Sequence, residues 1–412
     1  MIRIPMKRLA LTIIIAMLAV PCSRCSFARE AEIAFTGDII MHIPVKSCAR
    51  ARNRADGDRN GSLNNGGFDF LFEWIRDDLR RSDVVVGNME FPVSPPFRSE
   101  PWIFNCLPES IGAMKWAGIT MVTIANNHML DQGGQGVVDT MRFLARHGMD
   151  YIGAGETGES ARAGIVKKVR GVRVGFLGYT GVLNYPPAKK RQGYHLNLLD
   201  NRQALVRDIG EMRKRCDYLV LIAHAGEEYM PRPRRVEQDL FRDCVNAGAD
   251  LVIGHHPHLV QRAERVTAAD GRVCHIFYSL GNFISNQGMK AEAFYDGAPL
   301  TTRDSVIVRC LLKRAGRGKR PFARFEVLPV YTVNTVERAT GARAIQTVSI
   351  PREAAALKMR RDGAAAQERV DIERQLQNLY IKSKALRMAI FGSETGRAME
   401  EIKFIDDSGT YE

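Results

Sequence analysis

Residues 251–258 read LVIGHHPH, and this stretch decides how the rest of the chain is interpreted. The uninterrupted apolar run at 251–253 is typical of a strand buried on both faces, as in a sheet covered by helices or by a second sheet. Gly254 follows, and then come three histidines within four positions, His255, His256 and His258. Because a core gains little from buried imidazoles, this cluster at a strand end indicates a ligand site rather than packing.

Short apolar runs and amphipathic stretches alternate along the chain from residue 33 onward. We expect strands at 33–36, 83–86, 120–124, 151–153, 173–179, 218–223, 251–253 and 273–278, and helices at 69–81, 108–117, 134–147, 200–215 and 233–247. This alternation predicts an α/β fold.

The remaining stretches have other patterns. Residues 47–67 are polar and read as a long exposed insertion, and residues 184–199 and 285–303 read as loops. Two β-rich runs at 305–312 and 323–333 flank a basic turn at 313–320, which predicts a hairpin at the end of a sheet. The composition of residues 351–392 predicts one or two helices in a peripheral extension.

Polar residues follow directly after five of the predicted strands. They are Asp38 after the first strand, Asn88 and Glu90 after the second, Asn126, Asn127 and His128 after the third, His224 after the strand at 218–223, and the three histidines quoted above. Taken singly, Asp38 suits a helix N-cap and Asn126-Asn127 suits a turn. Since the carboxyl ends of strands in an open α/β sheet gather ligands, the whole set predicts one converging site.

The residue types at these strand ends select the chemistry. Carboxylate, amide and imidazole groups without thiolates suit one or two divalent cations such as Mn, Fe or Zn, and do not suit a cysteine-rich structural zinc site. His128 stands next to Asn127, so the amide oxygen could bind the metal while the imidazole acts as general acid. A metal-bound water would supply the nucleophile.

The first 28 residues have the pattern of a secretory signal peptide. Arg3, Lys7 and Arg8 precede a 12-residue apolar run at 9–20, and Ser26-Phe27-Ala28 offers a cleavage site. The run is shorter than the roughly 20 residues of a spanning helix, so a retained membrane anchor is the weaker interpretation. Lipidation at Cys22 is also a weaker interpretation. We therefore predict export to the periplasm or the exterior. The six cysteines that remain after cleavage permit disulfides without assigning them.

The chain is strongly basic. Removing the signal peptide, with its four basic residues, lowers the formal charge only from +13 to +9. Such a surface attracts anionic polymers and lipids. The basic residues form no stripe interleaved with aromatic residues, so we expect no nucleic acid partner.

The strand-end motifs resemble those of the CapA family of bacterial capsule-synthesis proteins, associated with poly-γ-glutamate capsule. The resemblance covers about residues 33–286. Its motifs are Gly37-Asp38, Gly87-Asn88-Met89-Glu90, Ala125-Asn126-Asn127-His128 with the following Leu130-Asp131-Gln132-Gly133, His224-Ala225-Gly226-Glu227-Glu228-Tyr229, Gly254-His255-His256-Pro257-His258 and Tyr278-Ser279-Leu280-Gly281-Asn282-Phe283. The family belongs with the calcineurin-like metallophosphoesterases, so the resemblance implies a four-layer α-β-β-α sandwich.

The resemblance also implies roles for individual residues. It makes His128 the acid outside the ligand shell and offers Glu228, Tyr229, His255 and Asn282 as substrate-binding residues. The implied metal ligands are Asp38, Asn88, Glu90, Asn127, His224, His256 and His258.

Three positions depart from the related patterns. Asn88 stands where a phosphoesterase has the aspartate that bridges two metals, and Glu90 either restores the charge or only one metal binds. His42 lies four residues after Asp38, so the Asp-x-His arrangement is missing. Ala225 replaces the tryptophan usual in the CapA-like pattern, which is expected to open one wall of the site.

We divide the chain into a signal peptide at 1–28, a CapA-like domain at 29–335 and a C-terminal helical extension at 336–412. The leading hypothesis is an exported protein that acts in the synthesis, release or transport of an anionic polymer such as poly-γ-glutamate, as a metal-dependent hydrolase working with a membrane-bound capsule synthesis complex. The alternatives are an exported phosphoesterase for small or lipid phosphoesters and a non-catalytic polymer-binding accessory protein.

Overall fold

The computed structural model describes residues 30–56, 65–187, 193–288, 290–295, 297–316, 319–336, 341–392 and 399–406. The predicted signal peptide and its cleavage site therefore lie outside the described residues. Within the described residues, none of the helices combines the length and apolar character that crossing a membrane requires.

A nine-stranded mixed sheet contains the first strand of the chain at its centre. In spatial order its strands are β18 (Arg343–Ser349), β17 (Phe322–Val336), β16 (Asp304–Lys313), β1 (Ala31–Ile39), β2 (Val84–Met89), β3 (Met121–Thr123) and β4 (Asp150–Ile152), with β13 (Asn282–Ile284) paired to β1 and β19 (Ile402–Phe404) paired to β17. The strands from β1 to β4 are parallel, and β16 and β17 form the predicted antiparallel hairpin.

A second sheet of six strands packs against the first. Its spatial order is β11 (Ala263–Thr267), β12 (Val273–Phe277), β10 (Leu251–His255), β9 (Tyr218–His224), β7 (Val172–Thr180) and β6 (Ile165–Val169). All residues of β9 and β10 are buried, which confirms that their apolar runs are strands covered on both faces.

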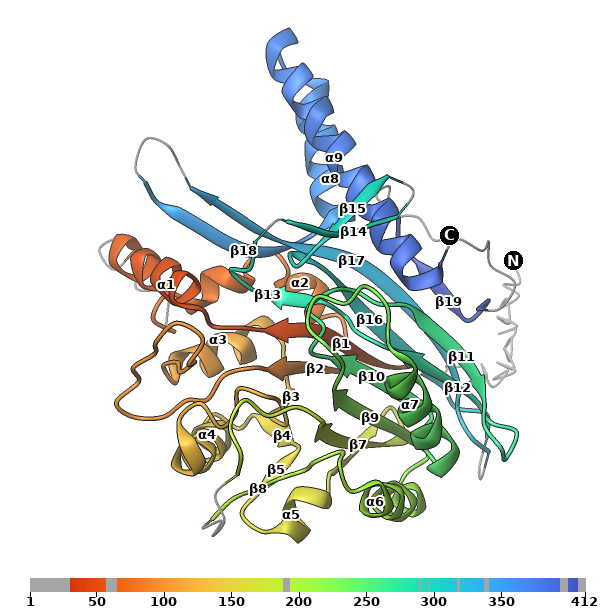
Figure 1. Cartoon of the computed structure of the whole chain (residues 1–412). Coiled ribbons are helices and arrows are strands. Elements are labelled where there is room, and N and C mark those ends of the chain that lie inside the picture. The colour runs from red at the N-terminus through yellow and green to blue at the C-terminus, as the bar shows by residue number, and fades with distance from the viewer. Residues whose placement is uncertain are drawn as a thin grey trace, which may run out of the picture.

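The two sheets pack face to face between helices (Figure 1). Phe35 and Val308 of the first sheet share one apolar core with Val220 and Ile253 of the second. The outer face of the first sheet is covered by α1 (Ile43–Asp56), η1 (Phe68–Phe72), α2 (Arg76–Leu79), α3 (Glu109–Ala117) and α4 (Gly133–Arg146), and that of the second by α6 (Arg202–Arg215) and α7 (Arg235–Ala247). The predicted four-layer α-β-β-α sandwich is confirmed.

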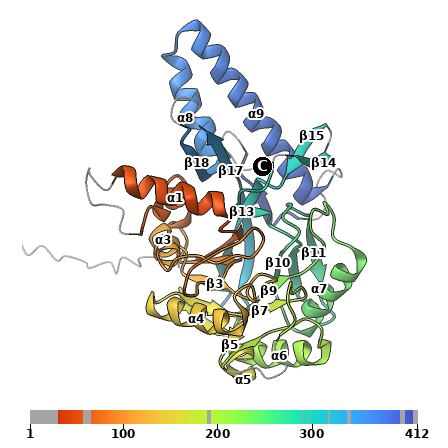
Figure 2. The ribbon, with the colours of Figure 1, turned by 60° about the vertical axis from the view of Figure 1, so that its left-hand side comes forward.

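Two C-terminal helices, α8 (Ile350–Asp362) and α9 (Ala366–Phe391), form a hairpin that stands away from the sandwich (Figure 2). Leu379 and Leu386 of α9 reach the core between the sheets. The predicted helices of this region are confirmed. β18 and β19, which lie within the expected extension, pair with β17 of the main sheet. The division of the chain into domains stays a prediction.

Several segments differ from the sequence-based expectation. Within the expected exposed insertion, residues 47–56 belong to α1, because Val45, Cys48 and Ala49 give this arginine-rich stretch one buried face. The expected loops contain β14 (Ala291–Tyr295), β15 (Ala298–Thr301) and β8 (His195–Leu196), which pairs with β5 (Ala154–Gly155). α9 packs against β14 and β15. Because α9 lies far from these strands in the sequence, no local pattern predicts them.

Two smaller details complete the comparison of the elements. The helix expected at 69–81 is split into η1 and α2, and a short helix α5 (Gly158–Arg162) begins with a capping box at Thr157. The cysteines from Cys48 to Cys310 are all buried and free, so within the described residues they form no disulfide.

Candidate metal centre and active site

Strand register places three of the predicted residues in one row on the first sheet. Asp38 at the carboxyl end of β1 lies opposite Asn88 on β2 and opposite Asn282 on β13. The preceding Gly37 permits this close approach, since a Cβ there would lie 2.1 Å from the carbonyl oxygen of Gly281. Asp38 is therefore fixed between two strands at the sheet edge.

The second sheet supplies a row of histidines. His224 at the end of β9 lies opposite His255 at the end of β10. The chain then turns sharply, and His256 and His258 adopt positive φ values of 99° and 58°, which are unfavourable for residues with a side chain. Such strain is typical of a functional site, where the surrounding structure holds side chains in fixed positions.

Asp38 joins the two rows. Its Oδ1 lies 2.8 Å from His255 Nδ1 and accepts a hydrogen bond of 2.8 Å from Asn88 Nδ2, while its Oδ2 lies 3.2 Å from His258 Nδ1. Burial opposes ionisation of this carboxyl, but the hydrogen bonds with His255 and His258 hold its pKa well below the ordinary value. Asp38 is thus a buried carboxylate shared by both sheets.

Glu90 provides a second buried carboxyl group beside Asp38. Its Oε2 accepts a hydrogen bond of 3.1 Å from Asn88, whereas its Oε1 has no hydrogen-bond partner within the described residues and lies 3.8 Å from His258 Nε2. Burial raises the pKa of Glu90 well above its ordinary value, and the charge of Asp38 raises it further. Within the described part of the chain, no lysine or arginine forms a salt bridge with the carboxyl groups of Asp38 and Glu90.

Two groups of side chains have the spacing of metal ligands. The ligand atoms of Asp38, Glu90 and His258 lie within 4.8 Å of one another, and so do those of Glu228, His256 and His258. His256 Nδ1 is buried and, like Glu90 Oε1, has no hydrogen-bond partner in the described structure. Carboxylate and imidazole ligands with unsatisfied buried atoms fit a divalent cation.

His224 and Asn127 extend this cluster toward β3. His224 Nε2 lies 2.9 Å from Asn127 Oδ1, and the rings of His224 and His256 are 4.8 Å apart. Burial, followed by neighbouring imidazoles, lowers the pKa of His224 well below its ordinary value and that of His256 to about 3. Both rings are therefore neutral, which is the form that binds metals.

Asn88 is a hydrogen-bond hub in this structure. Its Nδ2 contacts Asp38, Glu90 and His224 Nδ1, and its Oδ1 accepts a hydrogen bond of 3.2 Å from Asn126. The amide oxygen, with which Asn88 would bind a cation, is thus occupied by another side chain.

His128 lies at the rim of the cluster. Its Nδ1 lies 2.8 Å from Asp131 Oδ2, which also accepts a hydrogen bond from the backbone N–H of Phe104. The Phe104 ring stacks on the imidazole with centroids 4.0 Å apart, and Asn184 Nδ2 lies 3.2 Å from the same Nδ1. These contacts hold the ring of His128 at Nδ1 and on one face.

The four predicted substrate residues fall into two pairs. Glu228 and Tyr229 are exposed at the mouth of the site, where the Tyr229 ring lies 5.9 Å from that of His258. His255 and Asn282 are instead buried, in contact with Asp38 and His258 respectively. The structure therefore brings all the predicted residues into one region, with only the first pair open to a ligand.

Sequence reasoning assigned no role to Phe104 or Asn184, and Asp131 entered only as part of the motif Leu130-Asp131-Gln132-Gly133. Asp131 carries a usable signal, since it follows His128 by three residues and a single turn can join them. Phe104 and Asn184 come from distant loops, and nothing in their local sequence marks them.

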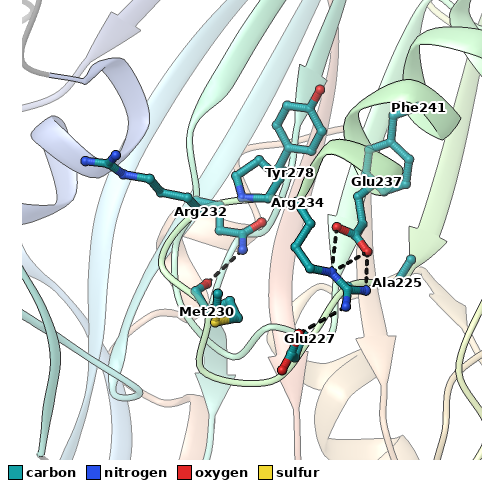
Figure 3. A pocket seen from close by; sticks show the side chains of 11 residues that line it. Ala225, Glu227, Met230, Arg232, Arg234, Glu237, Phe241 and Tyr278 are labelled. Atoms are coloured by element: carbon teal, nitrogen blue, oxygen red, sulfur yellow. Dashed lines mark hydrogen bonds and ion pairs between the residues drawn. The ribbon is translucent and has the colours of Figure 1, made fainter.

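The space beside Ala225 is small. Figure 3 shows a pocket between β9 and α7 in which Arg234 is bonded to both Glu227 and Glu237. Its free volume is about 10 Å³, room for little more than one water molecule. Arg234 is paired with its own neighbours, so it offers no free charge to a substrate.

Comparisons with known proteins match most of the chain. Residues 32–287 match a family described as bacterial capsule synthesis protein PGA_cap. The PGA biosynthesis protein CapA of Bacillus subtilis is 32% identical over 72% of this chain and 70% of its own length. The capsule biosynthesis protein CapA of Bacillus anthracis is also 32% identical, over 70% of this chain and 66% of its own length. A solved structure of a 5'-nucleotidase from Candida albicans is 12% identical with a TM-score of 0.37, over 72% of this chain and 50% of that one.

Proposed function

The chain belongs to the bacterial capsule synthesis protein PGA_cap family, as its motifs predicted, and from this membership and the site geometry we propose a metal-dependent hydrolase of an anionic polymer. Its substrate is poly-γ-glutamate or a similar extracellular polymer, which it cleaves during synthesis, release or transport. One or two divalent ions of the Mn, Fe or Zn class serve as cofactor.

The observation that carries this proposal is the pair of buried, unsatisfied ligand atoms. Glu90 Oε1 and His256 Nδ1 lack hydrogen-bond partners within the described residues, although both lie beside His258 in groups with metal-ligand spacing. Leaving a buried polar atom unpaired costs about 1–3 kcal/mol, so each of the two groups favours a ligand that its unpaired atom can bind. A divalent cation meets this condition.

The chain's residues would then divide the work. Asp38, Glu90 and His258 would hold one cation, and Glu228, His256 and His258 form a second group of ligands; a bound cation supplies a water of lowered pKa and polarises the scissile group. The contact between His128 Nδ1 and Asp131 directs the opposite nitrogen, Nε2, away from Asp131 and toward the leaving group. The stacked Phe104 ring fixes the plane of the imidazole and excludes water from one face.

Export belongs to the same proposal. The pattern of basic residues, apolar run and small-residue cleavage site at 1–28 supports a mature chain that starts near Arg29. In that compartment, a membrane-bound capsule synthesis complex would deliver the polymer. Amino-terminal sequencing of the exported form tests this, and lipid on Cys22 or a retained Met1 would contradict it.

The test of catalysis uses purified full-length protein loaded with Mn, Fe or Zn. Size-exclusion chromatography of poly-γ-glutamate should show metal-dependent shortening, abolished by a chelator and restored by the ion. Cleavage of a chromogenic phosphate ester without shortening of the polymer would identify a phosphoesterase. Polymer binding without any cleavage would identify an accessory protein. His147→Ala, at the half-buried histidine that forms the C-cap of α4, is the matched control.

A further inference from the structure

A pocket of about 330 Å³ adjoins the candidate metal centre. Its walls include His42, Trp102, Tyr229, Asn286, Gln287 and Lys290. It meets the centre at Tyr229, whose ring lies 5.9 Å from that of the candidate ligand His258. The volume lies at the lower end of the range for small-molecule sites, enough for a short segment of a chain.

Two aromatic side chains flank this pocket on strained backbone. Trp102 is 67% exposed and has a φ of 64°, and Tyr229 is 36% exposed and has a φ of 63°. Bulky residues seldom adopt positive φ, and an exposed indole gains nothing from the protein core. Because strained backbone and exposed aromatic rings occur together at this pocket, we interpret the rings as contacts for a ligand.

The loop that carries Trp102 is fixed in place. Glu100 and Ile103 exchange two backbone hydrogen bonds, so Pro101 and Trp102 form the tip of a tight hairpin. Beneath it, the buried ammonium group of Lys46 donates to Ser99 Oγ and to the carbonyl oxygen of Asn105. No carboxylate of the described residues pairs with Lys46, so its ammonium group stabilises the loop through these two hydrogen bonds. The backbone that carries the indole is therefore fixed before any ligand arrives.

The opposite wall is polar and carries positive charge. Gln287 Nε2 donates to the Tyr229 hydroxyl over 3.4 Å, and Arg343 donates to Asn286 Oδ1 over 3.1 Å. Lys290 is exposed and forms no salt bridge within the described residues. Glu292 also lies in the wall, so among the described lining residues Lys290 faces one carboxylate, and Arg343 adds positive charge from behind Asn286.

We propose that this pocket is a subsite for a glutamyl segment of the polymer, an assignment that rests on the proposed function. Lys290 pairs with a side-chain carboxylate of the polymer, and Trp102 and Tyr229 pack on its methylene groups. The amide side chains of Asn286 and Gln287 face its linking amides. The subsite thus places the chain beside His258 and recognises both its charge and its amide backbone.

The test measures binding to the chelator-treated full-length protein, so that it is independent of metal and of cleavage. A short γ-linked oligoglutamate should change the intrinsic fluorescence of the wild type. Trp74→Phe, which removes another exposed indole, should keep this change, and Trp102→Phe should lose it. Calorimetry should show about tenfold weaker binding for Lys290→Ala, because it loses a charge-assisted hydrogen bond.

Two further ligands complete the design. The same oligomer with its side-chain carboxyls amidated, and a polyphosphate, should both bind at least about tenfold more weakly. Equal binding of polyphosphate would show a general anion surface and overturn the assignment. So would wild-type affinity in both Trp102→Ala and Lys290→Ala, or the absence of any fluorescence change and any heat with the wild type.

The outcome is separable from that of the proposed hydrolysis. Binding that depends on Trp102 and Lys290, without metal-dependent shortening of the polymer, would keep the subsite and reject the hydrolase. Shortening that is unaffected by both substitutions would keep the hydrolase and reject the subsite.

Discussion

Strand β1 takes part in two buried charged clusters that differ in one respect. Near its middle, Ala34 lies opposite Arg309 of β16, a fully buried guanidinium surrounded by Glu32, Asp78 and Glu326 at 3.6–3.9 Å. Four residues later, Asp38 lies beside Glu90 among histidines. The first cluster contains its own permanent cation. The second, as far as the chain is described, does not.

The difference separates a structural ion cluster from a binding site. Around Arg309 the chain itself supplies charges of both signs, so this cluster is not short of positive charge, although Arg309 Nε and Nη1 and Asp78 Oδ2 have no hydrogen-bond partner within the described residues. Around Asp38 the pKa of Glu90 is raised and the pKa of His256 is lowered, because burial disfavours the charged form of each group. A site that is short of positive charge and rich in ligand atoms is suited to a metal cation.

Histidine substitutions at the second cluster should have the largest effects. His128→Ala should keep the metal content but lower turnover about 100-fold to 10,000-fold, as for loss of a positioned general acid. His256→Ala should lose metal as well, because a ligand holds the ion in the ground state. Elemental analysis paired with polymer-cleavage rates distinguishes the two. Wild-type rates in both variants, at equal protein abundance, would rule out catalysis at this cluster.

Removing the internal cation of the first cluster should destabilise the fold. Arg309→Met removes the cation that Glu32, Asp78 and Glu326 share and, among the described residues, leaves Asp78 only its pairing with Arg352, so we expect a loss of about 3–5 kcal/mol in the free energy of unfolding. Chemical denaturation measures it, with Arg314→Met on the exposed turn as control. Metal content of the folded protein should not change. Wild-type stability would show that the ion cluster contributes nothing.

Removing a carboxylate from the second cluster should not destabilise the metal-free protein, in contrast to the loss of Arg309. Glu90→Gln keeps the shape but relieves the repulsion with Asp38, so the metal-free protein should be at least as stable as the wild type. Metal affinity should fall about 10-fold to 100-fold, in the range seen for perturbed metal sites. Thermal unfolding with and without metal tests both parts. A less stable metal-free variant with unchanged affinity would make Glu90 a structural residue.

A smaller change should come from adding charge at Asn88. Asn88→Asp places a third carboxylate between Asp38 and Glu90, so the metal-free form should unfold more easily and metal should restore its stability. We expect about tenfold tighter metal binding, equivalent to about 1.4 kcal/mol. Calorimetric titration gives affinity and stoichiometry together. Weaker binding than the wild type would show that the amide of Asn88 is needed as a donor.

Much of the fold could be predicted from the sequence, because the strands that form its core are continuous apolar runs. The stretch at 251–258 indicated both a buried strand and its polar end, and register then brought His255 to Asp38. Helix α1 was not predicted, because its few buried residues are diluted by arginines. The hairpin β14–β15 was not predicted either, since α9 supports it from a distant part of the chain.

The site was predictable only in part for a similar reason. Ligand types at strand ends are local features, so Asp38, Glu90, His256 and His258 could be chosen from the sequence. His128 is oriented by Phe104 and Asn184, which come from loops that meet only after folding. The same is true of the pocket lined by Trp102 and Lys290. A polar or aromatic residue in a loop has no periodic pattern that reveals its partner.

Metal titration of the chelator-treated full-length protein tests the central claim most directly. Calorimetry with Mn²⁺ and Zn²⁺, followed by elemental analysis after dialysis, should show one or two bound ions per chain, and the stoichiometry should fall in His256→Ala but not in His147→Ala. Failure of the wild type to bind either ion, or equal binding by the wild type and His256→Ala, would contradict the account. The Asp38 cluster would then be a structural network like the one around Arg309.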